Sequence, residues 1–175
     1  MMMSDWNIIL TGFMGTGKSS VGKLLAQRLG YQFVDTDKLI EARCGRAVHE
    51  IFREQGEAAF REMEAALAGE LGAVEKQVIA TGGRLMLDAA NADNLSRKGR
   101  VFALWATPEE IIARVTKDTI AVRPLLAGPA PEVRIRALYE ERRAGYARFT
   151  PVRTSGKTIA EVVQVLVDHI AASEE

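Results

Sequence analysis

The stretch "GFMGTGKS" at residues 12–19 decides the fold of this chain. It fits the pattern G-x-x-x-x-G-K-[ST] without a mismatch, and it lies between an apolar run at residues 7–10 and a stretch of helical periodicity at residues 19–29. A glycine-rich loop in this context presents backbone N–H groups and the positive end of a helix to phosphate oxygens. The motif therefore predicts a nucleotide-phosphate site in which Lys18 reaches the β- and γ-phosphates and Ser19 ligates Mg²⁺.

The rest of the chain alternates short apolar runs with helical patterns, which is typical of a parallel sheet with helices on both faces. We therefore predict a three-layer α/β fold of the P-loop NTPase type, with five parallel strands and ligands at their carboxyl ends. The predicted strands span residues 7–10, 33–34, 77–80, 101–105 and 152–153. The predicted helices span residues 19–29, 37–44, 48–54, 57–71, 88–97 and 132–149, with further helices that begin near residues 108 and 158.

The length and the proline distribution bound the domain organisation. We expect a single domain over residues 1–175, because this length suits one core and no second compositional segment is present. Three of the five prolines lie within residues 117–131, which predicts a flap, or LID, insert there.

The composition limits the partners of the chain. Lys and Arg number 23, as do Asp and Glu, so the formal net charge of +0 argues against bulk affinity for nucleic acid or an anionic membrane. The single cysteine forms no intrachain disulfide, and no basic leader or apolar run of about 20 residues is present. We expect a cytoplasmic protein and, with no coiled-coil seam in view, a monomer.

Two carboxylates follow the second predicted strand, in "FVDTDKL". Phosphoryl transfer needs a group that orients the attacking hydroxyl and another that supports the water shell of Mg²⁺, so Asp35 and Asp37 are candidates for these two roles. Aspartate is also a preferred helix N-cap, and that structural interpretation is equally open for either residue.

Several arginines are candidates for binding anions. Arg61 in "FREMEAAL" and Arg142 in "YEERRAGY" lie on predicted helices, where an arginine is usually solvated. Arg123 in "VRPLLAG" lies in the predicted flap, from which a cation can close over the transferring phosphoryl group.

An ordered set of motifs runs along nearly the whole chain: "GFMGTGKSSVG", "FVDTD", "FREMEAAL", "VIATGG", "ATPEE", "RPLL" and the E-R-x-x-x-Y pattern at residues 141–146. This set resembles the shikimate kinase family. The resemblance implies transfer of the γ-phosphoryl group of ATP, the co-substrate, to the 3-hydroxyl of shikimate, with Mg²⁺ as the cofactor. The substrate would lie against helices at about residues 36–72.

The resemblance also implies roles for individual residues. The catalytic residues would be Lys18, Asp37 and Arg123. ATP would contact Gly15, Thr16, Gly17, Lys18, Ser19, Ser20 and Arg123. Shikimate would contact Asp37, Gly82 and Gly83, with Arg61 and Arg142 binding its carboxylate. Ser19 would ligate Mg²⁺, and Asp35 would act in the outer shell of the metal.

One departure from the family pattern stands in "TGGRLMLD", at residues 81–88, where Arg84 replaces the third glycine of the loop. We expect Arg84 to adopt an ordinary negative φ and to point away from the shikimate ring. Two other functions stay open: a P-loop kinase for another small polyol acid such as gluconate, and a nucleotide-binding pseudokinase with an altered acceptor loop. Arg153 and Lys157 are candidates for the adenine contact by nearness alone, and we assign neither.

Overall fold

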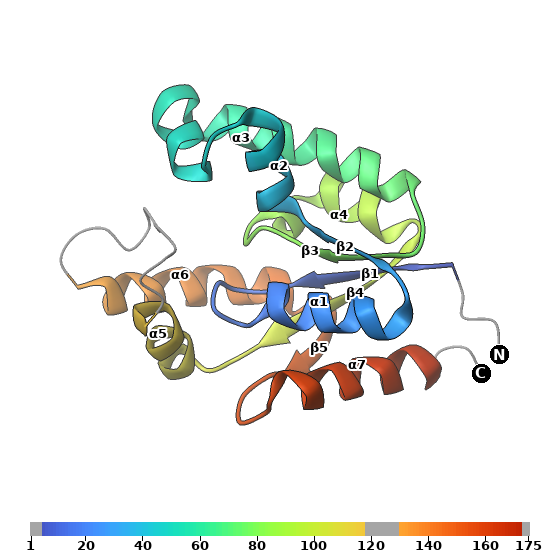
Figure 1. Ribbon diagram of the computed structural model, residues 1–175. Helices are drawn as coiled ribbons and strands as arrows, with labels where there is room; N and C mark the ends of the chain where they lie inside the picture. Colours follow the sequence, from blue (N-terminus) through green and yellow to red (C-terminus); the bar gives the residue numbers. More distant parts are fainter. Residues whose placement is uncertain (1–4, 118–129, 173–175) are drawn as a thin grey trace.

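A computed structural model describes residues 5–117 and 130–172 (Figure 1). Its centre is a five-stranded parallel sheet in the order β2-β3-β1-β4-β5, which confirms the predicted α/β P-loop fold. The strand β1 is central, and its five residues are all buried. The strands are β1 (Asn7–Thr11), β2 (Gln32–Asp35), β3 (Gln77–Ala80), β4 (Gly99–Trp105) and β5 (Thr150–Arg153).

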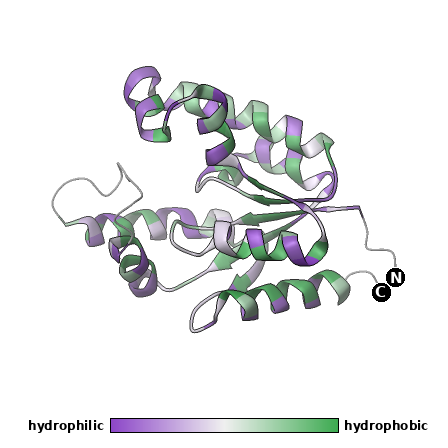
Figure 2. Cartoon of the chain, in the orientation of Figure 1, coloured by the Kyte–Doolittle hydropathy of each residue, from purple (hydrophilic) through white to green (hydrophobic). Residues whose placement is uncertain are grey.

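Helices cover both faces of the sheet (Figure 1). Ile8 and Leu10 of β1 pack with α1 (Lys18–Leu29) and α7 (Ile159–Ala172), whereas Ile9 points to the opposite face. That opposite face carries α2 (Thr36–Cys44), α3 (Val48–Ala73), the 3₁₀ turn η1 (Leu85–Leu87) and α4 (Ala89–Ser96). The remaining helices, α5 (Pro108–Lys117) and α6 (Pro131–Tyr146), pack together in a cluster with the residues that follow β1 and β4. Figure 2 shows the apolar sides of the helices turned toward the sheet.

Local signals explain where several helices begin and end. Asp35 caps α2 by accepting a hydrogen bond from the backbone N–H of Lys38 at 3.2 Å. The first turn of α7 carries a capping box, in which Thr158 and Glu161 each accept a hydrogen bond from the backbone N–H of the other. Gly30 ends α1 in the left-handed conformation, at φ 68°, which glycine adopts without strain.

The two predicted helices before β3 are confirmed as the two parts of one span, α3, which breaks between them at Gly56 with φ 85° and ψ 170°. The structure differs from the sequence prediction in two local features. The predicted helix at residues 132–149 ends at Tyr146, because the chain turns there into β5. The turn η1 was not predicted. The predicted LID at residues 117–131, with Arg123, lies almost wholly outside the described residues. Within the described ranges, no helix combines the length and apolarity that crossing a membrane requires.

Candidate active site

The phosphate loop lies between β1 and α1, as its sequence context predicts. Gly15 and Gly17 both have positive φ, 73° and 94°, so the loop depends on glycine at these positions. Thr16 is buried, and its hydroxyl donates to the Phe13 carbonyl at 2.8 Å. The Lys18 ammonium donates to the carbonyls of Gly12 and Phe13 at 2.8 and 2.9 Å, so the lysine folds back over its own loop.

Ser19 and Asp35 meet at the start of α1. The Ser19 hydroxyl donates to Asp35 Oδ2 at 2.6 Å, while Asp35 Oδ1 caps α2. Asp35 is therefore both a helix cap and a neighbour of the phosphate loop, and the two interpretations of this residue from sequence are compatible. Hydroxyl and carboxylate oxygens are the donors that Mg²⁺ prefers, so these two side chains fit the ion. In the described residues, no group of three or more His, Cys, Asp or Glu is arranged to hold a metal by itself.

Asp37 lies in the first turn of α2, two residues after the N-cap Asp35. Burial, reinforced by the negative charge of Asp35, raises the pKa of Asp37 to about 6, although the Lys18 charge opposes this shift. Its Oδ1 is buried and has no hydrogen-bond partner among the described residues. An unpaired buried carboxylate oxygen beside a phosphate loop is chemically suited to accept a hydrogen bond from a substrate hydroxyl.

The two glycines after β3, Gly82 and Gly83, differ in how much space is available for a side chain. A Cβ on Gly82 would lie 2.4 Å from Asp37 Oδ1 and 3.0 Å from Glu64 Oε1, so a side chain here would force the Asp37 carboxylate to move. A Cβ on Gly83 would meet only ordinary contact, at 3.7 Å from Arg142. The Gly82 N–H donates to the Thr36 hydroxyl at 2.8 Å.

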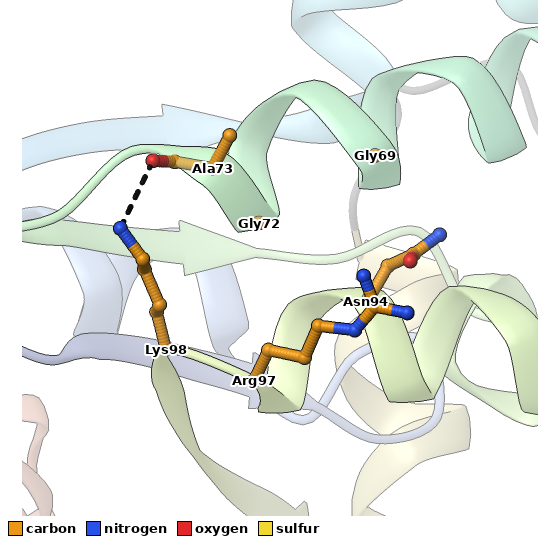
Figure 3. A pocket seen from close by; sticks show the side chains of 6 residues that line it. All are labelled: Gly69, Gly72, Ala73, Asn94, Arg97 and Lys98. Carbon is orange, nitrogen blue, oxygen red and sulfur yellow. Dashed lines mark hydrogen bonds between the residues drawn. The ribbon is translucent and has the colours of Figure 1, made fainter.

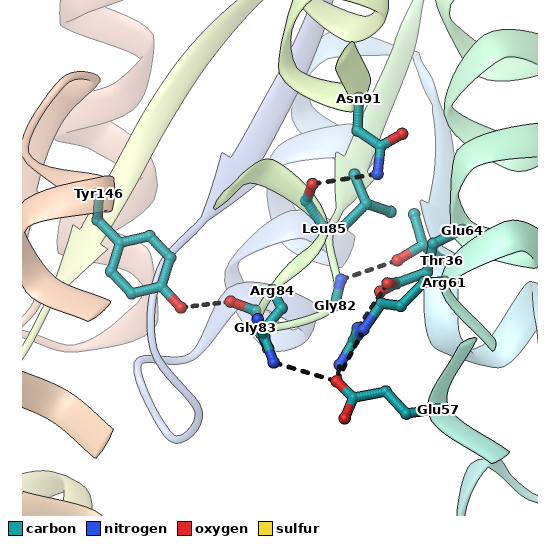
Figure 4. A network of polar contacts seen from close by, with 10 residues as sticks. All are labelled: Thr36, Glu57, Arg61, Glu64, Gly82, Gly83, Arg84, Leu85, Asn91 and Tyr146. Carbon is teal, nitrogen blue, oxygen red and sulfur yellow. Dashed lines mark hydrogen bonds and ion pairs between the residues drawn. The ribbon is translucent and has the colours of Figure 1, made fainter. Parts of the chain in front are cut away.

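The predicted carboxylate-binding arginine of α3, Arg61, lies between two acids (Figure 4). Its Nη1 donates to Glu64 Oε2 at 2.6 Å, and its Nε and Nη2 donate to Glu57 Oε1 at 3.2 and 2.9 Å. The guanidinium also lies over the rings of Phe52 and Phe60. Burial raises the pKa of Glu64, and the charge and hydrogen bond of Arg61 oppose that shift. Arg61 is one-third exposed rather than fully solvated.

The second predicted arginine, Arg142 of α6, is buried. Its guanidinium lies 5.9 Å from the centroid of the Phe13 ring, and its Nε has no hydrogen-bond partner in the described part of the chain. The neighbouring Tyr146 hydroxyl donates to the Gly83 carbonyl, which ties α6 to the loop after β3 (Figure 4). A buried, incompletely paired guanidinium is suited to an anionic ligand.

Arg84 has the negative φ that we predicted, −110°. Its Nη1 donates to Glu57 Oε1 at 3.0 Å, and its side chain is half exposed. It helps to line a pocket of about 360 Å³ between α3 and the η1–α4 segment, together with Glu57, Arg61, Glu64, Asp88 and Asn91.

A second pocket, of about 300 Å³, lies where α3 and α4 end (Figure 3). Gly72 permits the close approach of these helices, because a Cβ there would lie 2.4 Å from the Asn94 carbonyl oxygen. Both helices lead into the amino ends of strands, whereas ligands of parallel sheets bind at the carboxyl ends. We therefore interpret this pocket as a consequence of helix packing.

The structure brings together most of the predicted site. The carboxyl ends of β1, β2 and β3 are neighbours, since Leu10 pairs with Ala80 and Asp35 pairs with Ala80. Arg123 lies outside the described residues, and Ser20 is exposed on α1. The sequence interpretation assigned no role to Glu57, Glu64 or Arg114. Arg114 donates to the Gly15 carbonyl at 3.0 Å. The spacing of the two glutamates from Arg61, four residues before and three after, was the available signal.

Comparison with known proteins places these features in a family. The family model described as shikimate kinase matches residues 14–171. A shikimate kinase of Symbiobacterium thermophilum is 45% identical over 166 residues, which cover 94% of this chain and 95% of that protein. The solved shikimate kinase from Acinetobacter baumannii in complex with shikimate has a TM-score of 0.90 and 32% identity, over 98% of this chain and 96% of that one. A gluconokinase from Sinorhizobium meliloti, with a TM-score of 0.62 and 20% identity over 98% of this chain and 94% of that one, shares the fold.

Proposed function

Because the chain belongs to the shikimate kinase family, we propose that it transfers the γ-phosphoryl group of ATP to the 3-hydroxyl of shikimate, giving shikimate 3-phosphate and ADP. One observation carries the proposal. Asp37, Arg61, Gly82 and Arg142 converge from four separate segments beside the phosphate loop. Shikimate carries one carboxylate and three hydroxyls, which match two guanidinium groups and one carboxylate acceptor.

The phosphate loop holds the nucleotide in this proposal. Backbone N–H groups of Gly15, Thr16, Gly17 and the first residues of α1, with Ser19 and Ser20, face the phosphates. Lys18 leaves the loop carbonyls of Gly12 and Phe13 and neutralises the charge that develops on the transferring group. Arg123 adds a second cation from residues 117–131 when that segment closes on ATP.

The Ser19 hydroxyl would hold Mg²⁺ directly, and Asp35 would hold it through water. When bound, the ion neutralises charge on the β- and γ-phosphates. The 2.6 Å contact between Ser19 and Asp35 supports the assignment, because it keeps both oxygen donors at one place.

The acceptor is held by its carboxylate and its hydroxyls. Arg61 and Arg142 bind the carboxylate, Gly82 and Gly83 line the ring, and Gly83 supplies a backbone N–H, since that of Gly82 is already bonded to Thr36. Asp37 orients the 3-hydroxyl and takes its proton. A bond forms between the hydroxyl oxygen and the γ-phosphorus as the bond to the β-phosphate oxygen breaks, and ADP leaves with that electron pair.

The wider properties of the protein follow from the same assignment. We propose a single kinase domain over residues 1–175, with acceptor-binding helices at about residues 36–72 and a LID at about residues 117–131. Its partners are ATP and shikimate, both small molecules, rather than nucleic acid or a membrane. It acts as a cytoplasmic monomer.

A coupled ADP-release assay tests the proposed function. With ATP and Mg²⁺ present, we expect ADP formation that depends on shikimate, and little formation with gluconate, whose flexible open chain does not fit a site preorganised for a ring. Faster turnover with gluconate would replace the proposal by the polyol-acid kinase. Bound ATP without turnover of either acceptor would favour the pseudokinase.

A further inference from the structure

A single carboxylate oxygen joins two arginines at the rim of the candidate acceptor site. Glu57 Oε1 accepts hydrogen bonds from Arg61 Nε and Nη2, and also from Arg84 Nη1 at 3.0 Å (Figure 4). Glu57 lies directly after the break of α3 at Gly56, so it belongs to the first turn of the helical segment that follows. The three residues form a rim triad of Glu57, Arg61 and Arg84.

This arrangement creates a competition at Arg61. The Nη1 group of Arg61 is engaged by Glu64, and the Nε–Nη2 edge is engaged by Glu57. A planar guanidinium binds an incoming carboxylate through the same edges. Three of the five N–H donors of Arg61 are thus taken by glutamates, and a substrate carboxylate that binds in bidentate fashion through the Nε–Nη2 edge displaces Glu57 from it.

Glu57 is the glutamate that can leave. The Glu64 side chain is 1% exposed and packs beside Asp37 and Gly82, whereas the Glu57 side chain is 52% exposed. A buried carboxylate that loses its cation is strongly destabilised, but an exposed one regains water. Among the described residues, Arg84 is the second cation in contact with Glu57, and it approaches from a different segment of the chain.

We propose that Arg84 is a positioning residue, which retains Glu57 when the substrate carboxylate takes its place on Arg61. Without Arg84, Glu57 has Arg61 as its sole contacting cation in the described structure and competes more effectively with the substrate. The backbone of Arg84, at φ −110° and ψ −10°, holds this orientation without strain. The inference rests on the proposed function, because it needs a carboxylate substrate at Arg61.

Steady-state kinetics of a double-mutant cycle test the inference. Arg84→Ala should raise the KM for shikimate about twofold to fivefold, the range that an exposed ion pair supports, with kcat and the KM for ATP nearly unchanged. Glu57→Gln removes the competing charge, so adding Arg84→Ala to it should leave the KM for shikimate where Glu57→Gln alone sets it. Arg84→Lys, which keeps the charge, should restore most of the wild-type KM.

A matched control is the exposed pair of Arg43 and Glu70, which joins α2 to α3 at 2.8 Å on another surface. Arg43→Ala should leave the KM for shikimate unchanged, and urea unfolding of every variant separates a loss of stability from a kinetic effect.

An unchanged KM in Arg84→Ala would overturn the inference. An Arg84→Ala effect of the same size in the Glu57→Gln background would also overturn it, because Arg84 would then act on the substrate directly. Wild-type protein that does not turn over shikimate would overturn the proposed function, and the inference with it. Turnover by the wild type with no coupling between Arg84 and Glu57 would overturn the inference alone.

Discussion

Lys18 illustrates how the fold places a charge for the proposed chemistry. Its ammonium is held by the Gly12 and Phe13 carbonyls, so the charge lies over the phosphate loop. In the proposed reaction the same charge moves to the phosphates, where it acts on the transition state.

Lys18→Met should lower kcat by about 10³-fold or more, since methionine keeps most of the length of the unbranched side chain and removes its charge. The protein should still fold. Lys23→Met, at an exposed position of the same helix, is the matched control and should turn over normally. The measurement is the shikimate-dependent ADP-release rate. Normal turnover by Lys18→Met would contradict the assignment of this lysine.

Asp37 carries a free-energy cost that its proposed role as proton acceptor explains. Its pKa is raised from 3.8 to about 6, so the folded state binds this proton more tightly than the unfolded state. The contribution of Asp37 to the free energy of unfolding therefore falls as pH rises from about 4 to about 6. Above about pH 6 the ionised carboxylate destabilises the folded state by a constant amount.

Asp37→Asn should be more stable than the wild type by about 1–3 kcal/mol at pH 8, and this gain should shrink as pH falls from about 6 and disappear near about pH 3, where the aspartate is protonated in both states. Urea unfolding in EDTA without nucleotide measures the difference, because bound Mg²⁺ would alter the charge balance. Asp93→Asn, at an exposed position of α4, is measured beside it as the matched control for the amide substitution itself. A wild type that is more stable than Asp37→Asn at pH 8 would contradict the burial argument.

At the scale of elements, the loop between β3 and η1 joins three walls of the site. Gly82 contacts the region of α2 and α3 through Asp37 and Glu64, and the Gly83 carbonyl is bonded to Tyr146 of α6. The loop is therefore connected to both predicted carboxylate-binding arginines, to Arg61 through Glu64 and to Arg142 through α6.

Gly82→Ala and Gly83→Ala form a matched pair for this loop. The new methyl group at position 82 would overlap Asp37 Oδ1, so we expect a loss of about 1–2 kcal/mol in unfolding free energy and a marked fall in kcat. The methyl group at position 83 meets only Arg142 at 3.7 Å, so that variant should unfold like the wild type and show a raised KM for shikimate. Equal stability of the two variants would refute the steric argument at Gly82.

At the scale of the whole molecule, the proposed site has two halves at one edge of the sheet. The proposed nucleotide half is built by β1 and α1, and the proposed acceptor half by α2, α3, η1 and α6. Asp37 lies where the two halves meet. The Lys18 charge acts on it from the nucleotide half, and Asp37 and Glu64 both lie beside Gly82 in the acceptor half.

Ligand-induced thermal shifts should separate the two halves. A ligand at about 100 times its Kd stabilises by about 2.7 kcal/mol, which corresponds to a rise in Tm of about 5–10 °C for a domain of this size. Arg61→Ala should lose the Tm shift with shikimate and keep the Tm shift with ADP and Mg²⁺. Each shift is measured from the Tm of the variant without ligand, which should be lower than that of the wild type because Glu64 loses its partner. Arg53→Ala, an exposed arginine earlier in α3, should keep both shifts. A retained shikimate shift in Arg61→Ala would remove this residue from the site.

The sequence by itself determined the order of strands and helices, the phosphate loop and most helix ends, because those signals act between residues that are near in the chain. Asp35, Gly30 and the 158–161 capping box are examples. The break at Gly56 was likewise foreseen as a gap between two helices, while η1 was not, since one 3₁₀ turn leaves no periodic pattern.

The tertiary structure alone decided which charges meet. Arg84 and Glu57 are 27 positions apart, and Tyr146 and Gly83 are 63 apart, so neither contact has a local signature in the sequence. Burial, which raises the pKa of Asp37, likewise depends on the packing around α2 and on the approach of Gly82. The sheet order β2-β3-β1 brings these segments to one edge, and the ion pairs, exclusions and pKa values of the site follow from that juxtaposition.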